Sequence, residues 1–286
     1  MDELLSLSRF GFLSVTGKDA TKFLQGYTTC DLEVLDPGEV RLGAICNIQG
    51  RMVSNFYVVA IDDGYLLRMS RSLVSPTQGF LKKYIVFSKA VTRDLSDSYH
   101  CYGRMESMAG FPPIPGTFSV IDDDKVICVD GTRYEIWTGK SRSAADDISP
   151  WIAADIMQGH AWVDEHSANS FIPQMFNQHE LGGISFDKGC YLGQEIVARM
   201  QYRGELKKRL HRGHARQTTA IKNGDNLLNN ANRSVGTIVT SQGQEFLAVI
   251  QTKSTDDGQY FLADQTALTV VDLANAKQGL QVSSLI

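Results

Sequence analysis

Hydrophobic and polar positions in the first 160 residues follow two spacings, which predict a mixture of helices and strands. In TGKDATKFLQG, at 16–26, Ala20, Phe23 and Leu24 recur at helical spacing, and Gly26 stands where a helix would end. EVRLGAICN and MVSNFYVVAI have the composition of strands, and the turn-like NIQGR joins them. This pattern predicts a hairpin over 39–61.

Two Ser-Pro pairs predict the starts of two further helices. Ser75 and Pro76 are expected to be the N-cap and the first residue of a helix that reaches Tyr84. Ser149 and Pro150 are expected to open a second helix, which Gly159 closes. Strands and helices therefore mix without a repeating βαβ order, which favours an α+β fold over a doubly wound sheet.

After Arg203–Gly204 the pattern changes to short alternating segments separated by turn clusters. The strand-like segments are KRLHRGHA, VGTIVTS, EFLAVIQT and ALTVVDL. Short strands at this spacing predict a small antiparallel barrel or sandwich. We place a domain boundary near residue 205, with an α+β region over 1–205 and a C-terminal β-barrel domain over 206–286.

Composition and charge favour an ordinary soluble globular protein. The 286 residues are 43% hydrophobic and 21% charged, with a formal net charge of −4. This charge provides no global attraction to nucleic acid or to an anionic membrane. No run approaches the roughly 18 apolar residues of a membrane span. The N-terminal MDELLSLSRFGFLSV carries acid where a signal peptide would carry base, so we expect a cytoplasmic protein.

The five cysteines do not form a recognisable disulfide or metal pattern. Their number is odd, they are far apart and no pair makes C-x-x-C: Cys30, Cys46, Cys101, Cys128 and Cys190. We interpret Cys30, Cys101 and Cys128 as small core residues and Cys46 as a secondary site candidate. His211 and His214 are expected to share one strand face, but no third ligand is near, and no metal site is predicted.

The remaining cysteine, Cys190, lies in the glycine-rich segment GGISFDKGCYLGQEIVARMQYRG, at 182–204. GQEIVARM is expected to begin a helix, so Cys190 would precede a helix N-terminus, where unpaired amides favour an anion. Lys188 would add a positive charge nearby. Both effects favour the thiolate, which predicts a reactive thiol. An inert cysteine in a tight turn remains the alternative on these residues alone.

The same segment carries a family resemblance. The motif K-G-C-Y-x-G-Q-E is matched by Lys188, Gly189, Cys190, Tyr191, Gly193, Gln194 and Glu195. The flanks FIPQMFNQHELGGISF and VARMQYRGELKKR agree, as do the earlier GKDATKFLQGYTTCD, LGAICNIQGRMVSN and LKKYIVFSK. On nearly its whole length the chain resembles the YgfZ family of folate-binding, tRNA-modification-linked proteins. That family is related to the aminomethyltransferase (T-protein) of the glycine cleavage system.

The resemblance implies a ring of three subdomains, two of them intertwined within 1–205 and the last one barrel-like. It also implies bound folate, as tetrahydrofolate or a derivative, and a role in maintaining iron–sulfur enzymes, including those that thiolate tRNA. Cys190, at the one-carbon end of the folate, and Lys188 would be the catalytic residues. The folate-binding residues would be Gly189, Tyr191, Gly193, Gln194, Glu195 and Arg199.

One segment departs from the family pattern. Relatives commonly read I-E-A-G-x-P where this chain has IMQGHA, so Met157 replaces a glutamate and Ala161 a proline. In the related aminomethyltransferases a glutamate in this segment recognises the pterin, because a carboxylate accepts paired N–H bonds. A thioether does not. Asp155, two helical positions away, would point about 160° from Met157.

Three functions remain open. The preferred one is support of iron–sulfur enzymes and tRNA thiolation through a folate-associated Cys190, with a folate-dependent aminomethyl-type transferase as its enzymatic variant. The second is a non-enzymatic assembly factor without folate, in which Cys190 transiently ligates a cluster that a partner enzyme, a carrier or glutathione completes. The third is RNA binding by the basic segment Arg199–Arg216, which is disfavoured because alternating strand positions divide its charges between two faces. Direct tRNA binding and membrane binding are therefore not expected.

Overall fold

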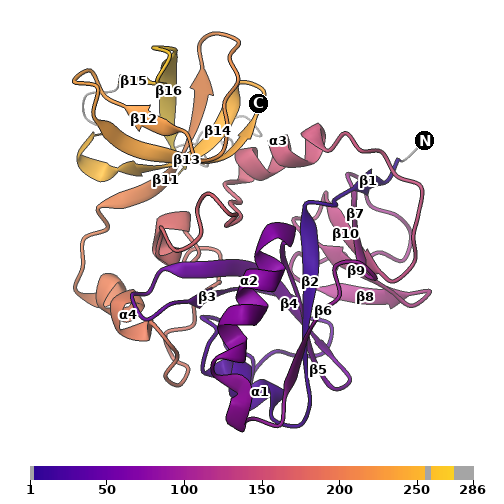
Figure 1. The fold of residues 1–286 in the computed structure, drawn as a ribbon. Coiled ribbons are helices and arrows are strands. Elements are labelled where there is room, and N and C mark those ends of the chain that lie inside the picture. Colours follow the sequence, from indigo (N-terminus) through magenta and orange to yellow (C-terminus); the bar gives the residue numbers. More distant parts are fainter. Residues whose placement is uncertain (1–2, 255–258, 274–286) are drawn as a thin grey trace. The chain divides into compact units, whose positions relative to one another are not determined.

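The computed structural model describes residues 3–254 and 259–273, and the chain divides into two compact units (Figure 1). Unit 1 consists of Met1–Ile148, Val163–Pro173 and Gln178–Ala198. Unit 2 consists of Ser149–Trp162, Gln174–Asn177 and Arg199–Ile286. Each unit has a buried apolar cluster of its own.

The first sheet of unit 1 is covered by two helices. Its five antiparallel strands, in pairing order, are β3 (Arg41–Cys46), β4 (Met52–Ile61), β5 (Gly64–Ser70), β2 (Phe10–Thr16) and β6 (Val91–Asp94). The helices are α1 (Ala20–Gln25) and α2 (Arg71–Lys82), and the short 3-10 helix η1 (Ile85–Phe87) follows α2. Phe23 and Leu24 of α1 and Leu81 of α2 join the apolar cluster of this sheet. The predicted first helix and the hairpin over 39–61 are confirmed.

The second sheet of unit 1 is joined to the first by a buried ion pair. Its strands, in pairing order, are β1 (Leu5–Ser6), β7 (His100–Arg104), β10 (Tyr134–Thr138), β9 (Asp124–Cys128) and β8 (Phe118–Ile121). Arg68 of β5 donates to both carboxylate oxygens of Glu135 of β10, at 3.0 and 2.6 Å. Trp137 donates to the same carboxylate at 2.7 Å. Charge-assisted paired bonds of this kind fix orientation as well as distance, so they align the two sheets.

The expected start of α2 is wrong. The helix begins at Arg71, directly after β5, and Pro76 lies inside it rather than at its first position. Leu73, Val74, Thr77 and Leu81 are its buried residues. This apolar face begins before Pro76, and its burial against the sheet outweighs the backbone hydrogen bond that a proline forgoes.

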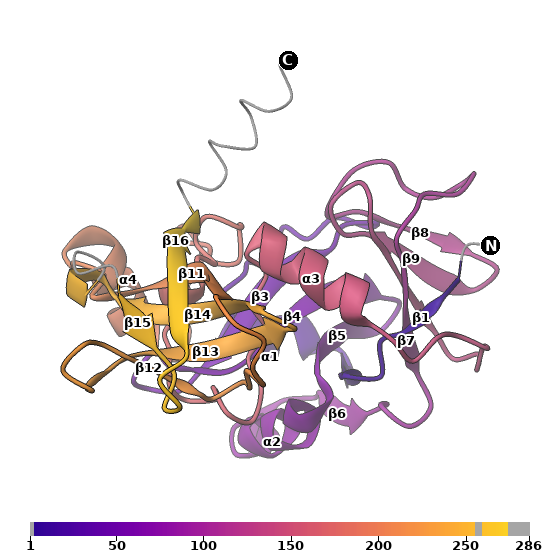
Figure 2. The ribbon, with the colours of Figure 1, turned by 90° about the horizontal axis from the view of Figure 1, so that it is seen from above.

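Unit 2 contains a closed six-stranded antiparallel barrel (Figure 2). Its strands, in pairing order, are β11 (Lys208–Ala215), β14 (Glu245–Gln251), β13 (Ser234–Gln242), β12 (Asn226–Leu228), β15 (Tyr260–Phe261) and β16 (Ala267–Asp272). Gly213 allows the ring of Phe246 to pack directly against β11, because a Cβ at 213 would overlap that ring. The predicted C-terminal barrel is confirmed, although β12 and β15 were not predicted.

The other helical segments are α3 (Ser149–Gln158), α4 (Gln194–Tyr202), η2 (Pro173–Phe176) and η3 (Thr252–Ser254). The predicted start of α3 at Ser149 and its end before Gly159 are confirmed. α3 packs against the barrel, where Gln242 donates to the Ser149 hydroxyl at 2.9 Å (Figures 1 and 2). Within the described ranges, no helix combines the length and the apolar composition needed to cross a bilayer.

The two histidines of HRGH do not share a face, which corrects the expectation from the sequence. His211 is buried, whereas His214 is exposed and its Nδ1 lies 2.7 Å from Glu245. Their separation of three positions places them on opposite sides of β11, because strand side chains alternate with a period of two. In the part of the chain that the structure describes, no cluster of three histidine, cysteine or acidic side chains could hold a metal ion.

Candidate functional site: the Cys190 loop

Cys190 is the exposed cysteine of this chain. It lies in the segment 187–193, which we call the Cys190 loop, between the glycine pair Gly182–Gly183 and the first residue of α4, Gln194. The other four cysteines are buried. A solvent-exposed thiol is chemically accessible, and the four buried ones are not. The Cys190 loop is therefore the part of the molecule where cysteine chemistry can occur.

Lys188 holds this loop in place through hydrogen bonds, and its side chain does not extend into solvent. The Lys188 side chain is buried, and its Nζ donates to the carbonyl oxygens of Thr28 and Cys30, each at 2.7 Å. The same Nζ lies 5.3 Å from the centre of the Tyr191 ring. Burial lowers the pKa of Lys188 to about 8, against the opposing effect of nearby Cys30 and two acidic residues. These contacts hold the loop, while a catalytic role of Lys188 stays a prediction.

The segment 26–30 binds the loop and the chain before it through backbone groups. The amide of Leu192 donates to the Gly26 carbonyl at 3.0 Å, and the amide of Ser185 donates to the Thr29 carbonyl at 2.9 Å. The Thr29 hydroxyl donates to the Gly183 carbonyl at 2.6 Å and accepts from the Ala44 amide at 2.8 Å. This buried hydroxyl therefore joins the glycine pair that precedes the loop to β3.

Gly193 and Gly189 have different roles, although the sequence motif contains both. Gly193 has φ +84°, and a Cβ there would collide with the Asn47 carbonyl and come within 3.2 Å of the Cys46 Cβ. A Cβ at Gly189 would meet nothing within 4 Å. The need for glycine is therefore clear at 193, where the loop closes on the β3–β4 turn, and sterics do not require it at 189.

The other predicted folate-binding residues differ in burial and in the contacts that they make. Tyr191 is buried, and burial raises the pKa of its hydroxyl. The Gln194 side chain accepts from the Tyr191 amide at 3.4 Å, so it caps the loop. Glu195 and Arg199 are exposed on α4, and Arg199 belongs to unit 2. Their contact with a folate stays a prediction.

The two cysteines closest to the loop belong to the core. Cys30 is buried, and desolvation raises its pKa to about 11, although the positive charge of Lys188 acts in the opposite direction. Cys46, the secondary candidate from the sequence, is fully buried, and burial raises its pKa as well. Neutral, enclosed thiols are poor nucleophiles and poor metal ligands, so Cys46 is not a site residue.

Position 157 lacks the acceptor that a pterin would need. Met157 lies on α3 with its side chain half-exposed, and Arg212 of the barrel donates toward its sulfur at 2.9 Å. Asp155 is buried, so it faces away from Met157, as the helical spacing predicts. The polar group beside Met157 is thus a donor, which does not complement the N–H edge of a pterin.

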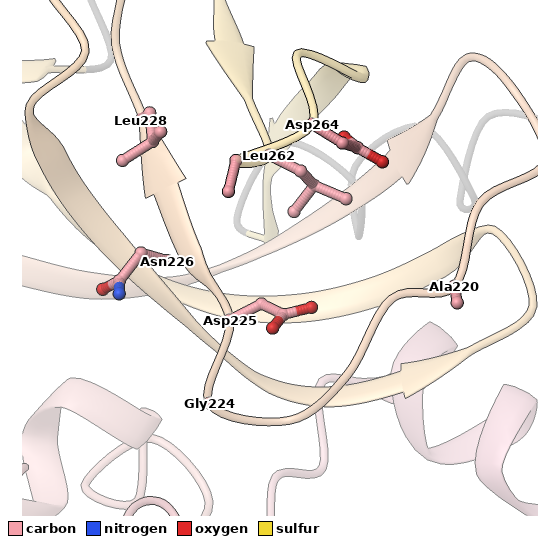
Figure 3. A pocket seen from close by; sticks show the side chains of 8 residues that line it. Ala220, Gly224, Asp225, Asn226, Leu228, Leu262 and Asp264 are labelled. Atoms are coloured by element: carbon pink, nitrogen blue, oxygen red, sulfur yellow. The ribbon is translucent and has the colours of Figure 1, made fainter.

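A cavity of about 400 Å³ lies in unit 2, and none of the predicted site residues is among the residues that line it. Figure 3 shows Asp225 and Leu228 beside the loop that carries Leu262 and Asp264. Both carboxylates already accept backbone N–H bonds, Asp225 from Lys222 and Asp264 from Thr266, each at 2.9 Å. These hydrogen bonds show that the two carboxylates stabilise their own loops, so we assign no functional site to this cavity.

The sequence analysis did not identify the segment 26–30 as part of the site. Thr28 and Thr29 are completely buried. The Thr28 carbonyl accepts from Lys188, the Thr29 carbonyl accepts from Ser185, and the Thr29 hydroxyl donates to the Gly183 carbonyl. The signal was present in GYTTCD, a polar stretch directly after a helix end, but the spacing pattern identifies only the helix end at Gly26.

Sequence comparisons relate the chain to curated proteins. Residues 3–103 match the family model of the GCVT N-terminal domain. The chain is 33% identical over 233 residues to the tRNA-modifying protein YgfZ of Cronobacter sakazakii, covering 72% of this chain and 69% of that protein. It is 34% identical over 230 residues to the protein of the same name from Yersinia pseudotuberculosis, covering 73% and 69%.

The fold is also similar to a solved structure. The glycine cleavage system aminomethyltransferase T from Bartonella henselae matches with a TM-score of 0.68 over 94% of this chain and 85% of that chain. The sequence identity is 12%, so this likeness establishes the fold and does not transfer a reaction.

Proposed function

Because the chain belongs to the family of the tRNA-modifying protein YgfZ, we propose that it supports tRNA modification through the thiol of Cys190. The observation that carries this proposal is the contrast between one exposed cysteine and four buried ones. The exposed thiol lies on a loop fixed by Lys188 and Leu192, so its position is defined while its sulfur stays accessible.

Tetrahydrofolate is the cofactor that the resemblance implies, but the residues at the pterin position do not fit it. Met157 offers a thioether, and its polar neighbour Arg212 is a donor. The paired N–H groups of a pterin require acceptors. We therefore assign no step of the function to a folate.

The chemistry that remains is ligation by sulfur. A cysteine thiolate can supply one ligand to an iron–sulfur cluster that passes through as cargo, and such clusters usually take four. Cys190 would lose its proton to solvent and bind the cluster in place of one carrier ligand. The displaced carrier ligand would take up a proton as it leaves. The other ligands would come from the carrier, the recipient enzyme or glutathione. In this role the protein serves iron–sulfur enzymes, including those that thiolate tRNA.

A second candidate is a folate-dependent transferase, which the match of residues 3–103 to the family model of the GCVT N-terminal domain favours. Titration with tetrahydrofolate separates the two candidates, with Trp151 and Trp162 as fluorescent reporters. Weak, unsaturated quenching is expected from the absence of an acceptor at Met157. Tight saturable binding would favour the transferase.

The main test removes the sulfur of Cys190 with a substitution that should keep the fold intact. Cys190→Ser should fold normally because the side chain is exposed and nearly isosteric, yet tRNA thiolation should fall to the level of cells that lack the gene. Thiolated nucleosides from complemented cells are quantified by mass spectrometry. Cys128→Ala, which removes a buried thiol, is the matched control and should retain thiolation. Full thiolation with Cys190→Ser would contradict the proposal.

A further inference from the structure

Apolar side chains are exposed together just after α2. Phe87 is 99% exposed, Val86 72% and Tyr84 38%. An isolated exposed residue is common, but neighbouring exposed apolar residues with an aromatic ring fully in solvent indicate a contact surface. This group is separate from the Cys190 loop and has no part in the proposed sulfur chemistry.

Lysines lie next to these side chains in the sequence and on the adjoining segment around α1, although the whole chain carries a formal net charge of −4. Five lysines are exposed in the two segments that meet here, and with the two rings they form what we call the lysine–aromatic surface: Lys18, Lys22, Lys82, Lys83, Tyr84, Phe87 and Lys89. Asp19 and Asp63 border it, and the Asp19 carboxylate accepts the backbone N–H of Lys89 at 2.7 Å. The local charge is therefore positive.

Ring contacts connect the two segments into one surface. The Tyr27 ring, after α1, lies 5.0 Å from the Tyr84 ring, which lies 5.4 Å from the Phe80 ring of α2. Lys83 Nζ is 5.9 Å from the centre of the Phe80 ring. Figure 1 shows α1 beside the end of α2, in agreement with these contacts. The two segments that carry the lysines are therefore packed against each other.

We propose that the lysine–aromatic surface binds a single-stranded segment of RNA. Lysine side chains attract the phosphates, and exposed rings such as Phe87 and Tyr84 stack with unpaired bases. A protein partner is less suited to this surface, because lysine is depleted in protein–protein interfaces. The inference rests on the proposed function in one respect, since service to tRNA modification makes RNA the relevant polyanion.

The surface also adjoins the segment that holds the Cys190 loop. Tyr27 contributes its ring to the aromatic chain, while the carbonyls of its neighbours Gly26 and Thr28 accept from Leu192 and Lys188 of the loop. The segment 26–30 therefore contacts both Tyr84 of the lysine–aromatic surface and two residues of the Cys190 loop. The basic segment Arg199–Arg216 is a different part of the chain. Its Arg209 and Arg212 pair with Ile250 and Leu247 of β14, and they lie on opposite faces of β11 because they are three positions apart.

Binding is tested with the full chain and a labelled 12-nucleotide single-stranded oligoribonucleotide, by fluorescence anisotropy at several salt concentrations. Saturable binding should weaken with salt, with a logarithmic slope of up to about −3.5 if all five lysines contact phosphates at about −0.7 each. Phe87→Ser should lower affinity roughly tenfold by removing one stacking ring. The matched control Val120→Ser, 63% exposed on β8, should leave affinity unchanged.

Charge is tested in the same assay. The double variant Lys82→Ala with Lys89→Ala should make the slope less steep by about 1.4, as two lost phosphate contacts require. Lys222→Ala with Lys253→Ala removes the same charge from exposed positions of unit 2 and should leave the slope unchanged. Equal affinity of Phe87→Ser and Val120→Ser, or no saturation at low salt, would overturn the proposal.

The two proposals fail separately. Cys190→Ser should keep full RNA binding while losing thiolation. If Phe87→Ser impairs thiolation in cells but leaves RNA binding of the purified chain unchanged, the RNA proposal is wrong and the surface serves a protein partner.

Discussion

Positions 188 and 190 are two residues apart, yet their side chains have opposite environments. The amine of Lys188 is buried against the carbonyls of Thr28 and Cys30, and the thiol of Cys190 is exposed. Hydrogen bonds from a charged group contribute about 1.5–3 kcal/mol each, so the lysine can fix the loop without any contribution from the cysteine. This division of roles keeps the sulfur available and its backbone ordered.

At the scale of single residues, Met157 provides a test of folate recognition. Met157→Glu places a carboxylate beside Arg212 at an exposed position, so the free energy of unfolding should change by less than about 1 kcal/mol. If a pterin is read at this position, affinity for tetrahydrofolate should rise at least roughly tenfold, because a charge-assisted acceptor is restored. Quenching of tryptophan fluorescence measures it.

Met157→Gln, which has similar size but no charge, is the control for that experiment. A neutral amide should give a smaller gain than the carboxylate. Equal affinity of the parent chain, Met157→Gln and Met157→Glu would mean that position 157 does not read the pterin.

At the scale of elements, the Cys190 loop and the β3–β4 turn approach each other through two glycines. Gly193 has φ +84° and Gly50 has φ +69°, and a Cβ on Gly50 would lie 2.9 Å from the Ile196 Cβ. A side chain on either residue would separate the loop from the turn. The start of α4 is therefore positioned by backbone contact with the hairpin.

This contact gives a prediction with an internal control. Gly193→Ala should lower the free energy of unfolding by about 2 kcal/mol or more, from unfavourable φ and overlap with the Asn47 carbonyl. Gly189→Ala, in open space on the same loop, should stay within about 0.5 kcal/mol of the parent chain. Urea unfolding monitored by circular dichroism measures both. Equal losses would show that the loop does not depend on the turn.

The sequence predicted the elements whose signals are local. The hairpin over 39–61 and helix α3 follow from spacing and from terminal glycines, which neighbouring residues determine. The start of α2 was missed because Leu73 and Val74 belong to its buried face, ahead of a proline that suggested a later start. The anchor of Lys188 on Thr28 joins residues 160 positions apart, and no single-sequence pattern contains such a contact.

At the scale of the whole molecule, buried titratable groups govern how stability responds to pH. Burial raises the pKa of Cys30 from 9.0 to about 11, and it lowers the pKa of Lys188 from 10.5 to about 8. The raised thiol pKa contributes stability below pH 9 that is lost as the pH rises toward 11. The lowered lysine pKa acts in the opposite direction, because the cost of burying an ammonium disappears as the pH rises from 8 to 10.5.

The contribution of Cys30 can be isolated by comparing pH profiles. The rise of the Cys30 pKa from 9.0 to about 11 corresponds to roughly 2–3 kcal/mol of unfolding free energy lost between pH 9 and 11. Cys30→Ala should be less stable than the parent chain at every pH because of the space it leaves. Between pH 9 and 11, however, its free energy of unfolding should fall by roughly 2–3 kcal/mol less than that of the parent chain. Urea unfolding under reducing conditions at pH 8, 9, 10 and 11 gives the profiles. Parallel profiles would mean that Cys30 does not set the response.

The chain crosses between its two units after residues 148, 162, 173, 177 and 198. Helix α3, which packs against the barrel, comes from the middle of the chain, so a fragment starting at Arg199 leaves it behind. Neither unit corresponds to one uninterrupted stretch of coding sequence. A single crossover in the gene therefore cannot exchange one unit without also dividing the other.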